Sequence, residues 1–450
     1  ERLKVELDKL GVEHQEQKTW ACSSRFSNCA EVENLIGIIP GKSDLPYLAL
    51  MAHYDSVPMA PGAGDDGAGV VAILEAVRAL KLEVPYKHPI MLIITDAEES
   101  GLLGAEAFFN QHPLAKKVGI VLNIEGSGSS GSSMVLRTSD KNELLIKSYS
   151  NQNTSPYGFS FVKEIFKRMP NDTDFSVVER ANIAGIDFAF AGERNHYHTP
   201  NDTVENIDLR TIQHHGENIL PLSRELLSAD WEDMGDDYIY GGEVYGFWTQ
   251  WKSSNSIFIC LLSAFLLIAA LIKSKINLKR AALGILFSPL TVFTTILSSL
   301  TGFYLLSLLA GNVISWPGID WPYRLLLIGS IAIGTLLGTA VSRRFIAEQE
   351  MIFGSWFFWL LLTLAITILL PDAANIFILP LIFASLLLLL STFLGDKHKS
   401  NFLLLTLIMT LPMTLGIIFS LEQSQGYKLV WAVLPFAGLY ALIISPFLYH

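Results

Sequence analysis

The sequence predicts an α/β domain with a mostly parallel β-sheet flanked by helices, followed by an all-α domain that crosses a membrane several times. Two observations carry this prediction. Up to Lys252 the chain holds 22 cations and 37 anions, and short apolar runs alternate with segments of helical periodicity. Beyond it, ten cations and six anions are scattered among long apolar stretches. We therefore expect a soluble domain over residues 1–252 and a membrane domain over residues 253–450.

The expected sheet is built from short runs that are apolar throughout. Such strands are buried on both faces, which is typical of parallel sheets covered by helices. Apolar positions that share one helical face predict helices over residues 67–81, 102–112 and 204–227. The predicted strands cover residues 47–52, 89–95, 119–124, 133–136 and 184–191.

The second half contains seven apolar stretches long enough to cross a bilayer, which needs roughly 20 residues. One stretch alone could be a buried core helix, but seven in succession with almost no internal charge favour a membrane. Pro289 lies inside the overlong second stretch, where we expect a kink or a tilt. The seven expected spans cover residues 255–272, 281–310, 323–341, 352–370, 373–394, 402–421 and 429–448.

The connections between these spans predict an orientation. Cations gather in the first, third and fifth connections, at 273–280, 343–344 and 397–399, and the even-numbered connections are poor in them. By the positive-inside rule the odd connections are cytoplasmic, which places the soluble domain in the periplasm, the exterior or an organelle lumen. Because Glu1 is not a methionine and no apolar segment precedes the soluble half, we expect a fragment without its N-terminal anchor or signal. The end at His450, directly after a span, suggests the same of the C-terminus.

Composition excludes several classes of protein. With 50% hydrophobic and 17% charged residues the chain is not a disordered one, and a net charge of −11 argues against a nucleic-acid partner. Three cysteines are too few for a fold built on disulfides. In an exported domain Cys22 and Cys29 could pair, or they could remain free thiols. Cys260 lies in the first span and is expected to be a small apolar residue there.

Histidines and carboxylates follow the predicted strands, at the edge where α/β sheets carry their active sites. Several carboxylates in one cleft are costly unless cations neutralise them. Histidine and carboxylate without thiolate suit Zn²⁺ or, less specifically, Mn²⁺ or Co²⁺. The residues concerned are His53, Asp55, Asp65, Asp66, Asp96, Glu98, Glu99, Glu125, His196 and His198.

The motifs HYD, GAGDDGAG, DAEESGLLG, NIEG and YHTPND, in this order and spacing, resemble the M28 family of zinc aminopeptidases over residues 35–227. The stretch NDTDFSVVERANIAGIDFAFAG and the apolar tail are similar to a membrane branch that contains endoplasmic reticulum metallopeptidases and fungal vacuolar membrane proteases. The resemblance implies a zinc aminopeptidase-like fold with two zinc ions per chain. It implies one site of His53, Asp65 and Glu125 and a second of Asp65, Glu99 and His198, with a cis peptide bond after the bridging Asp65.

The resemblance also implies the catalytic groups. Glu98 would be the general base that takes a proton from water and returns it to the leaving amine. Tyr197 would donate to the developing oxyanion, unless it is only a packing aromatic. Asp55 lies two residues from His53 on an extended segment, so its carboxylate could accept the imidazole N–H.

Other polar residues near these motifs have competing interpretations. Asp202 either supports the loop of His198 or only forms a turn, and His196 is expected not to be a ligand. His214 and His215 are expected to be surface or packing residues of the last helix. Asp174 and Phe175 resemble the family's substrate-pocket segment, and core packing of Phe175 is the alternative.

These observations lead to a membrane-anchored two-zinc exopeptidase, foremost an aminopeptidase, because an acidic domain attracts the cationic N-terminus of a peptide. A carboxypeptidase or dipeptidase with the same site is a close variant. Glutaminyl cyclases resemble the fold, but His53 and the GAGDD loop favour two metals. A non-catalytic membrane scaffold or transporter is the alternative class, disfavoured because all five ligands and Glu98 are present. A peptide and the bilayer are the expected partners; the sequence indicates no oligomeric state.

Overall fold

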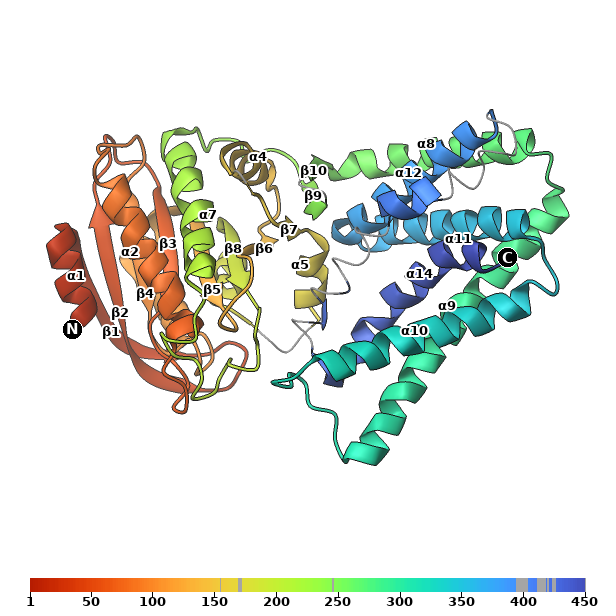
Figure 1. Ribbon diagram of the computed structural model, residues 1–450. Helices are drawn as coiled ribbons and strands as arrows, with labels where there is room; N and C mark the ends of the chain where they lie inside the picture. The colour runs from red at the N-terminus through yellow and green to blue at the C-terminus, as the bar shows by residue number, and fades with distance from the viewer. Residues whose placement is uncertain are drawn as a thin grey trace. The chain divides into compact units, whose positions relative to one another are not determined.

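The computed structural model describes residues 1–153, 155–168, 172–244, 247–393, 404–410, 418, 421–422 and 426–449. The chain divides into two compact units, Glu1–Ser253 and Ser254–His450, each with its own core. In Figure 1 the first unit runs from red to green and the second from green to blue. The division falls one residue after the boundary expected at 252/253.

The first unit is organised around a ten-stranded mixed sheet with the order β1-β2-β4-β3-β5-β8-β6-β7-β9-β10. Its centre consists of the four parallel strands β4, β3, β5 and β8. The strands are β1 (Glu13–Cys22), β2 (Cys29–Ile39), β3 (Tyr47–His53), β4 (Ile90–Thr95), β5 (Val118–Gly126), β6 (Met134–Thr138), β7 (Gly158–Phe159), β8 (Ala184–Phe190), β9 (Tyr238–Val244) and β10 (Phe247–Lys252).

The α/β class is confirmed, and parallel pairing is found in the centre and between β6 and β7. On one side β2 pairs antiparallel with both β1 and β4, and on the other β6 pairs antiparallel with β8. The sequence analysis missed the hairpin of β1 and β2. Strand β1 buries only Gln17 and Ala21, so its polar edge lacks the apolar run that marked the central strands. Cys22 and Cys29 form a disulfide across the last pair of this hairpin.

Side chains of the central strands alternate between two buried layers, as the two-residue period of a strand requires. Leu48 and Leu50 of β3 join one cluster, whereas Ala49 and Met51 join the other. The first cluster packs under α1 (Arg2–Leu10), α2 (Ala68–Leu80), α4 (Glu143–Gln152) and α7 (Leu209–Ser228). The second packs against α3 (Leu103–Gln111) and α6 (Phe175–Arg180).

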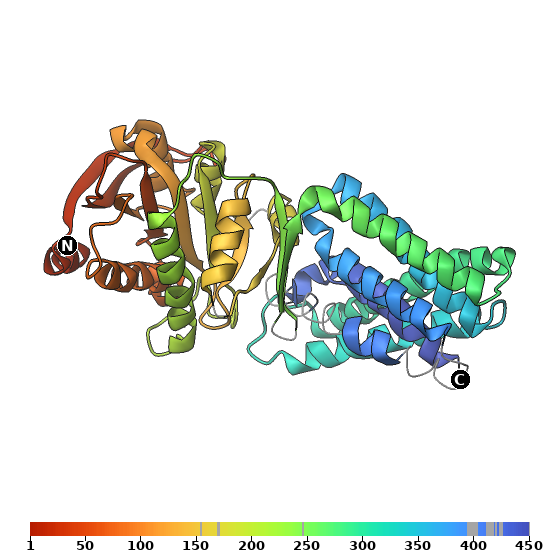
Figure 2. The ribbon, with the colours of Figure 1, turned by 90° about the horizontal axis from the view of Figure 1, so that it is seen from above.

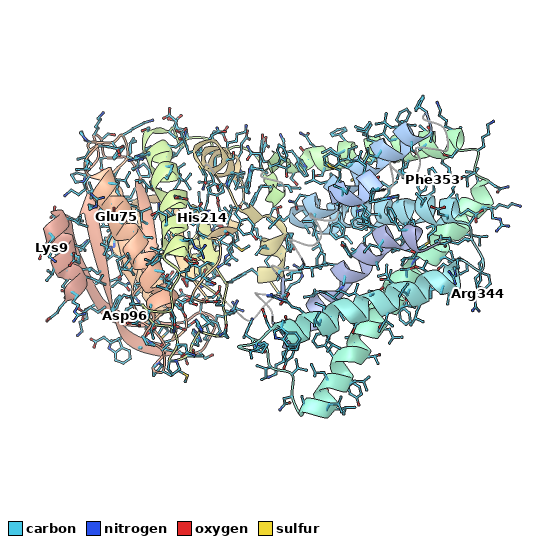
Figure 3. All side chains as sticks on the ribbon, viewed as in Figure 1. Lys9, Glu75, Asp96, His214, Arg344 and Phe353 are labelled. Carbon is cyan, nitrogen blue, oxygen red and sulfur yellow. A yellow bond between two sulfur atoms is a disulfide. The ribbon has the colours of Figure 1, made fainter. Side chains whose placement is uncertain are left out.

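Figures 1 and 2 show α2 and α7 side by side along one face of the sheet, and Figure 3 labels Lys9, Glu75 and His214 on the helices of this layer. The last helix was expected from residue 204 but begins at Leu209. There the Asp208 carboxylate accepts the backbone N–H of Arg210 at 2.9 Å, which caps the first turn. A short helix, α5, covers Phe161–Phe166.

The second unit is helical. In its described residues four helices are long and apolar enough to cross a membrane: α8 (Ser256–Lys273), α9 (Leu278–Ala310), α10 (Trp321–Ser342) and α11 (Glu348–Leu369). Helix α9 continues through Pro289. Cys260 is buried on α8, as expected. The cationic pair Arg343 and Arg344 directly follows α10, and Figure 3 labels Arg344.

The remaining expected spans differ from the prediction of seven. The fifth forms α12 (Asn375–Ser391), which has 17 residues. The seventh is divided into a 3₁₀ segment (Tyr427–Ala432), α14 (Leu434–Ile444) and a final 3₁₀ turn (Ser445–Leu448). Much of the sixth, residues 402–421, falls outside the described residues. Within its described part, residues 404–410 are helical. The length of an apolar stretch in the sequence does not show where the helix within it is interrupted.

Candidate metal centre

The site lies at the carboxyl ends of the four central parallel strands. His53 is the last residue of β3, and Glu125 lies near the end of β5. Glu98 and Glu99 follow β4, and His198 follows β8. Because the carboxyl ends of parallel strands meet at one edge, residues far apart in the sequence converge here. All five expected metal ligands and Glu98 are brought together, as the sequence analysis anticipated for this edge.

Asp65 stands between the two histidines. Its Oδ1 lies 3.1 Å from Nε2 of His53, and its Oδ2 lies 3.0 Å from Nε2 of His198. Glu99 Oε1 is 2.9 Å from the same His198 nitrogen. The peptide bond between Asp65 and Asp66 is cis. One carboxylate therefore faces two imidazoles with different oxygens, an arrangement that suits a bridging ligand.

The groups form two clusters of possible metal ligands among the described residues. One consists of Asp65, Glu99 and His198, and in each cluster the ligand atoms lie within 4.8 Å of one another. In the first, Asp65 Oδ2, Glu99 Oε1 and His198 Nε2 are buried and make no hydrogen bond in the described part of the chain, despite their short separations. Three ligand atoms that are close without being hydrogen-bonded to one another fit a shared cation.

The second cluster differs from the expected ligand set. It consists of His53, Glu98 and Glu125, so Glu98 occupies a place that the sequence analysis gave to Asp65. Nε2 of His53 is 3.4 Å from Glu125 Oε1 and 3.1 Å from Asp65 Oδ1, so Asp65 is also within reach. The structure thus places Glu98 beside the ligands, where either a base or a ligand would lie.

Burial and mutual charge dominate the electrostatics. Burial raises the pKa of Glu125 to about 8 and holds that of Glu98 well above its usual value. Burial works against the charged imidazole of His198, but contacts with Asp65 and Glu99 raise its pKa to about 9. Burial opposes ionisation of Asp65 as well, yet the two histidines lower its pKa to about 2. Without a cation, the cluster therefore keeps protons that a metal would displace.

Asp55 has a different set of partners from the one expected. Its backbone carbonyl, not its carboxylate, lies closest to Nδ1 of His53, at 3.0 Å against 3.4 Å. The carboxylate accepts the backbone N–H groups of Glu98 at 3.0 Å and Glu99 at 3.2 Å. Asp55 thus orients the imidazole through its main chain and the loop after β4 through its side chain.

Asp202 supports the loop of Asp65, whereas the alternatives expected from the sequence were support of the loop of His198 or only a turn. Its carboxylate accepts the N–H of Gly64 at 2.6 Å and that of Asp65 at 3.3 Å. A Cβ on Gly64 would lie 2.1 Å from the carbonyl oxygen of Gly128, so only glycine fits there. Asp66 accepts the N–H of Gly69 at 3.0 Å in the first turn of α2.

Tyr197 stacks on the ring of the ligand candidate His198, with centroids 3.8 Å apart. The Arg194 guanidinium lies 4.9 Å from the centre of the tyrosine ring, and its side chain is buried. Burial and the nearby carboxylates raise the pKa of the Tyr197 hydroxyl. Sequence reasoning missed Arg194, because a single arginine in a loop forms no pattern that would mark it.

The other candidates lie outside the cluster. Nδ1 of His196 is 2.7 Å from the Ser129 hydroxyl, which agrees with the expectation that His196 is not a ligand. His215 is fully buried, with Nδ1 2.7 Å from the hydroxyl of Ser133. Phe175 is fully buried in the core, which agrees with the alternative of core packing and not with a place in the wall of a substrate pocket. Asp174 is buried and accepts a hydrogen bond from the Thr95 hydroxyl at 2.5 Å.

The segment that carries this site matches the model of a known protein family. The model described as Peptidase family M28 matches residues 34–223. Endoplasmic reticulum metallopeptidase 1 of Mus musculus is 32% identical over 197 residues, which cover 43% of this chain and 22% of that protein. A vacuolar membrane protease of Candida dubliniensis is 34% identical over 210 residues, covering 46% and 22%. The matched part of the chain therefore corresponds to about a fifth of each relative.

Among solved structures, a zinc aminopeptidase from Bacillus subtilis is similar at 24% identity and a TM-score of 0.35, covering 47% of this chain and 54% of that one. Residues 34–223, the segment that the family model matches, contain every residue of the two clusters described above.

Proposed function

Residues 34–223 of this chain form a Peptidase family M28 domain, and on this premise we propose that the chain is a membrane-anchored exopeptidase that works with two zinc ions. The observation that carries the proposal is the Asp65 carboxylate, which offers one oxygen to the side of His53 and the other to the side of His198. A carboxylate so placed can be shared by two cations. Each cation would then have three protein ligands, which leaves coordination positions open.

The residues fit zinc. The donors are imidazole nitrogens and carboxylate oxygens, with His53, Asp65 and Glu125 for one ion and Asp65, Glu99 and His198 for the other. The buried ligand atoms that lack hydrogen bonds among the described residues support the site of Asp65, Glu99 and His198. When bound, zinc would polarise the scissile carbonyl and make a water acidic near neutral pH.

Glu98 is the proposed general base. It follows β4 beside the ligands, only 8% exposed, and Asp55 holds its backbone N–H. Burial raises the pKa of this carboxyl, which makes its carboxylate a stronger base toward a water proton. The same carboxyl can then deliver that proton to the leaving amine. Tyr197, stacked on His198, is proposed as the donor to the oxyanion.

We prefer the amino terminus of a peptide as the bound end. The part of the chain up to Lys252 carries 37 anions against 22 cations, and the site itself is lined with carboxylates. Such a field attracts an ammonium group and repels a free carboxylate. The cationic connections of the second unit support a non-cytoplasmic location of this domain.

A peptide panel tests the proposal. The full chain in detergent is given one pentapeptide with both ends free, N-acetylated, or C-amidated, with zinc or after chelation. An aminopeptidase cleaves the free and amidated peptides, spares the acetylated one, and loses activity on chelation. Cleavage of the acetylated peptide but not the amidated one would make it a carboxypeptidase. No cleavage of any peptide with zinc present would contradict the proposed function.

A further inference from the structure

The turn that carries Glu98 and Glu99 has an unfavourable backbone. Ala97 and Leu102, which flank it, have φ angles of 52° and 62°, in the left-handed region that non-glycine residues seldom adopt. Both conformations are unfavourable for residues with a Cβ, so the surroundings must hold the turn in place. Inside the turn the Glu98 carbonyl accepts the N–H groups of Gly101 and Leu102, both at 2.8 Å. Asp55 restrains it on the side of the metal ligands.

The hairpin of β1 and β2 restrains both ends of this turn. The backbone N–H of Glu33 donates to Asp96 Oδ2 at 2.9 Å, and Asp96 donates its own N–H to the Asn34 side chain at 3.0 Å. The Asn34 amide also donates to the carbonyl of Gly104 at 2.8 Å. Strand β2 therefore holds the residues that precede and follow the turn.

The tip segment, residues 23–28, covers the turn itself. Asn28 Nδ2 donates to the carbonyl oxygen of Ser100 at 3.1 Å, one residue after Glu99. A Cβ built on Gly101 would lie 3.2 Å from Cβ of Phe26 and 3.3 Å from Cβ of Ser23, so the segment is in close contact with the glycine backbone. The Cys22–Cys29 disulfide closes the tip segment at its base.

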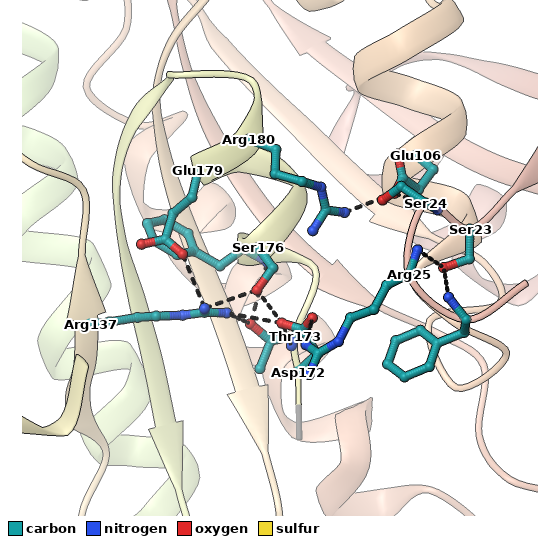
Figure 4. A network of polar contacts seen from close by, with 12 residues as sticks. Ser23, Ser24, Arg25, Glu106, Arg137, Asp172, Thr173, Ser176, Glu179 and Arg180 are labelled. Atoms are coloured by element: carbon teal, nitrogen blue, oxygen red, sulfur yellow. Dashed lines mark hydrogen bonds and ion pairs between the residues drawn. The ribbon is translucent and has the colours of Figure 1, made fainter. Parts of the chain in front are cut away.

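Hydrogen bonds to Glu106 and an ion pair with Asp172 hold the tip segment (Figure 4). Ser24 donates to Glu106 of α3 through its hydroxyl at 2.6 Å and its N–H at 3.2 Å, and Arg180 of α6 pairs with the same carboxylate at 2.8 Å. Arg25 forms an ion pair with Asp172. The tip segment is thus tied to α3 through Glu106 and to Asp172, which precedes α6, and it also contacts the turn.

We propose that the tip segment is a positioning element for catalysis, and that Asn28 acts through the Ser100 carbonyl to hold Glu98 and Glu99 in place. Asn28 touches no ligand atom; its role is to keep the turn in the conformation in which Asp55 can hold both backbone amides. This inference rests on the proposed function for its catalytic part, whereas the restraint on the turn can be measured without catalysis.

The test compares Asn28→Leu, which removes the donor at similar volume, with Asn28→Gln, which keeps an amide, in the full chain in detergent. Hydrogen exchange of residues 97–103 is measured on metal-free protein, and kcat and KM on zinc-loaded protein. We expect Asn28→Leu to speed exchange of this peptide and lower kcat, each about tenfold, with KM changed less than twofold. Asn28→Gln should recover most of both.

Unchanged exchange and kcat in Asn28→Leu, or equal losses in Asn28→Gln, would overturn the proposal. The proposal would also be overturned if the loss of kcat were accompanied by faster hydrogen exchange throughout the sheet. Phe26→Ala, which removes the ring whose Cδ2 lies 3.2 Å from the place a Cβ on Gly101 would take, serves if Asn28→Leu does not fold, and the same two readouts decide. If the wild-type chain cleaves no peptide, the proposed function fails, and the exchange result alone decides whether Asn28 restrains the turn.

Discussion

Oδ2 of Asp65 and Nε2 of His198 lie 3.0 Å apart without a hydrogen bond between them. The loops that carry them follow β3 and β8, strands separated in the sheet by β5. Two buried polar atoms that approach so closely without a hydrogen bond are explained if both are directed at a third partner. The first prediction tests this explanation.

Asp65→Asn should reduce the zinc content of the purified chain from about two ions to fewer than one. A bridging carboxylate serves both ions, so its loss weakens both sites, whereas a ligand of one site would cost one ion. Elemental analysis after gel filtration measures the ratio. Glu75→Gln, the same change of charge on the exposed face of α2, is the control and should retain the metal. A wild-type ratio of one or below would rule out the dinuclear site.

Substitutions at Glu98 and Glu99 should separate base from ligand. Glu98→Gln keeps the size of the side chain and removes its basicity, so we expect zinc to remain and kcat to fall by at least about 10²-fold, with little change in KM. Glu99→Gln should lose metal together with activity. Steady-state kinetics and metal analysis on the same preparations decide between them. Loss of zinc in Glu98→Gln with retention in Glu99→Gln would exchange the two assignments.

His215 should make the first unit sensitive to acid. Burial lowers the pKa of this histidine to about 3, from the usual 6.5. Between these values the unfolded chain binds a proton that the folded chain does not, so the free energy of unfolding falls as pH drops from about 6.5 toward 3. The contribution is at most about 5 kcal/mol, at 1.36 kcal/mol per pH unit.

His215→Gln removes this titration. Urea unfolding of the metal-free full chain at pH 7 and pH 4, monitored by hydrogen exchange of the peptide that contains β5, measures the contribution of this titration to the free energy of unfolding. The stability difference between wild type and His215→Gln should shrink, or reverse, at pH 4. His14→Gln, on β1, is the matched histidine-to-glutamine substitution for comparison. Parallel pH curves for wild type and His215→Gln would show that the buried imidazole does not contribute.

Cysteine labelling tests the orientation in the membrane. In a Cys260→Ala background, a cysteine at Ser274, between α8 and α9, should react with an impermeant reagent only from the cytoplasmic side of sealed vesicles. A cysteine at the exposed Ser43 of the first unit should react only from the opposite side. Reaction of both from the same side would overturn the proposed location.

The sequence allowed the central strands and the cluster at their ends to be predicted, for a physical reason. Strands buried on both faces are apolar throughout, and β3, β4 and β5 have this character. The edge strand β1 is polar on most of its length and gave no such signal. The backbone groups that bind the side chains of Asp55 and Asp202 could not be predicted either. The N–H groups that Asp55 and Asp202 accept belong to distant turns, which only the folded chain brings near.

The insertion of β8 between β5 and β6 sets an order on biosynthesis. When β6 has left the ribosome, His53, Asp65 and Glu125 have been made, but His198 has not. Until residues 184–190 emerge, β6 lacks β8, the strand that joins it to the centre of the sheet, and the carboxylates lack their second imidazole. The nascent domain thus holds an incomplete acidic cluster, which gains its second imidazole after β8 has been made and before β9 and β10 extend the sheet.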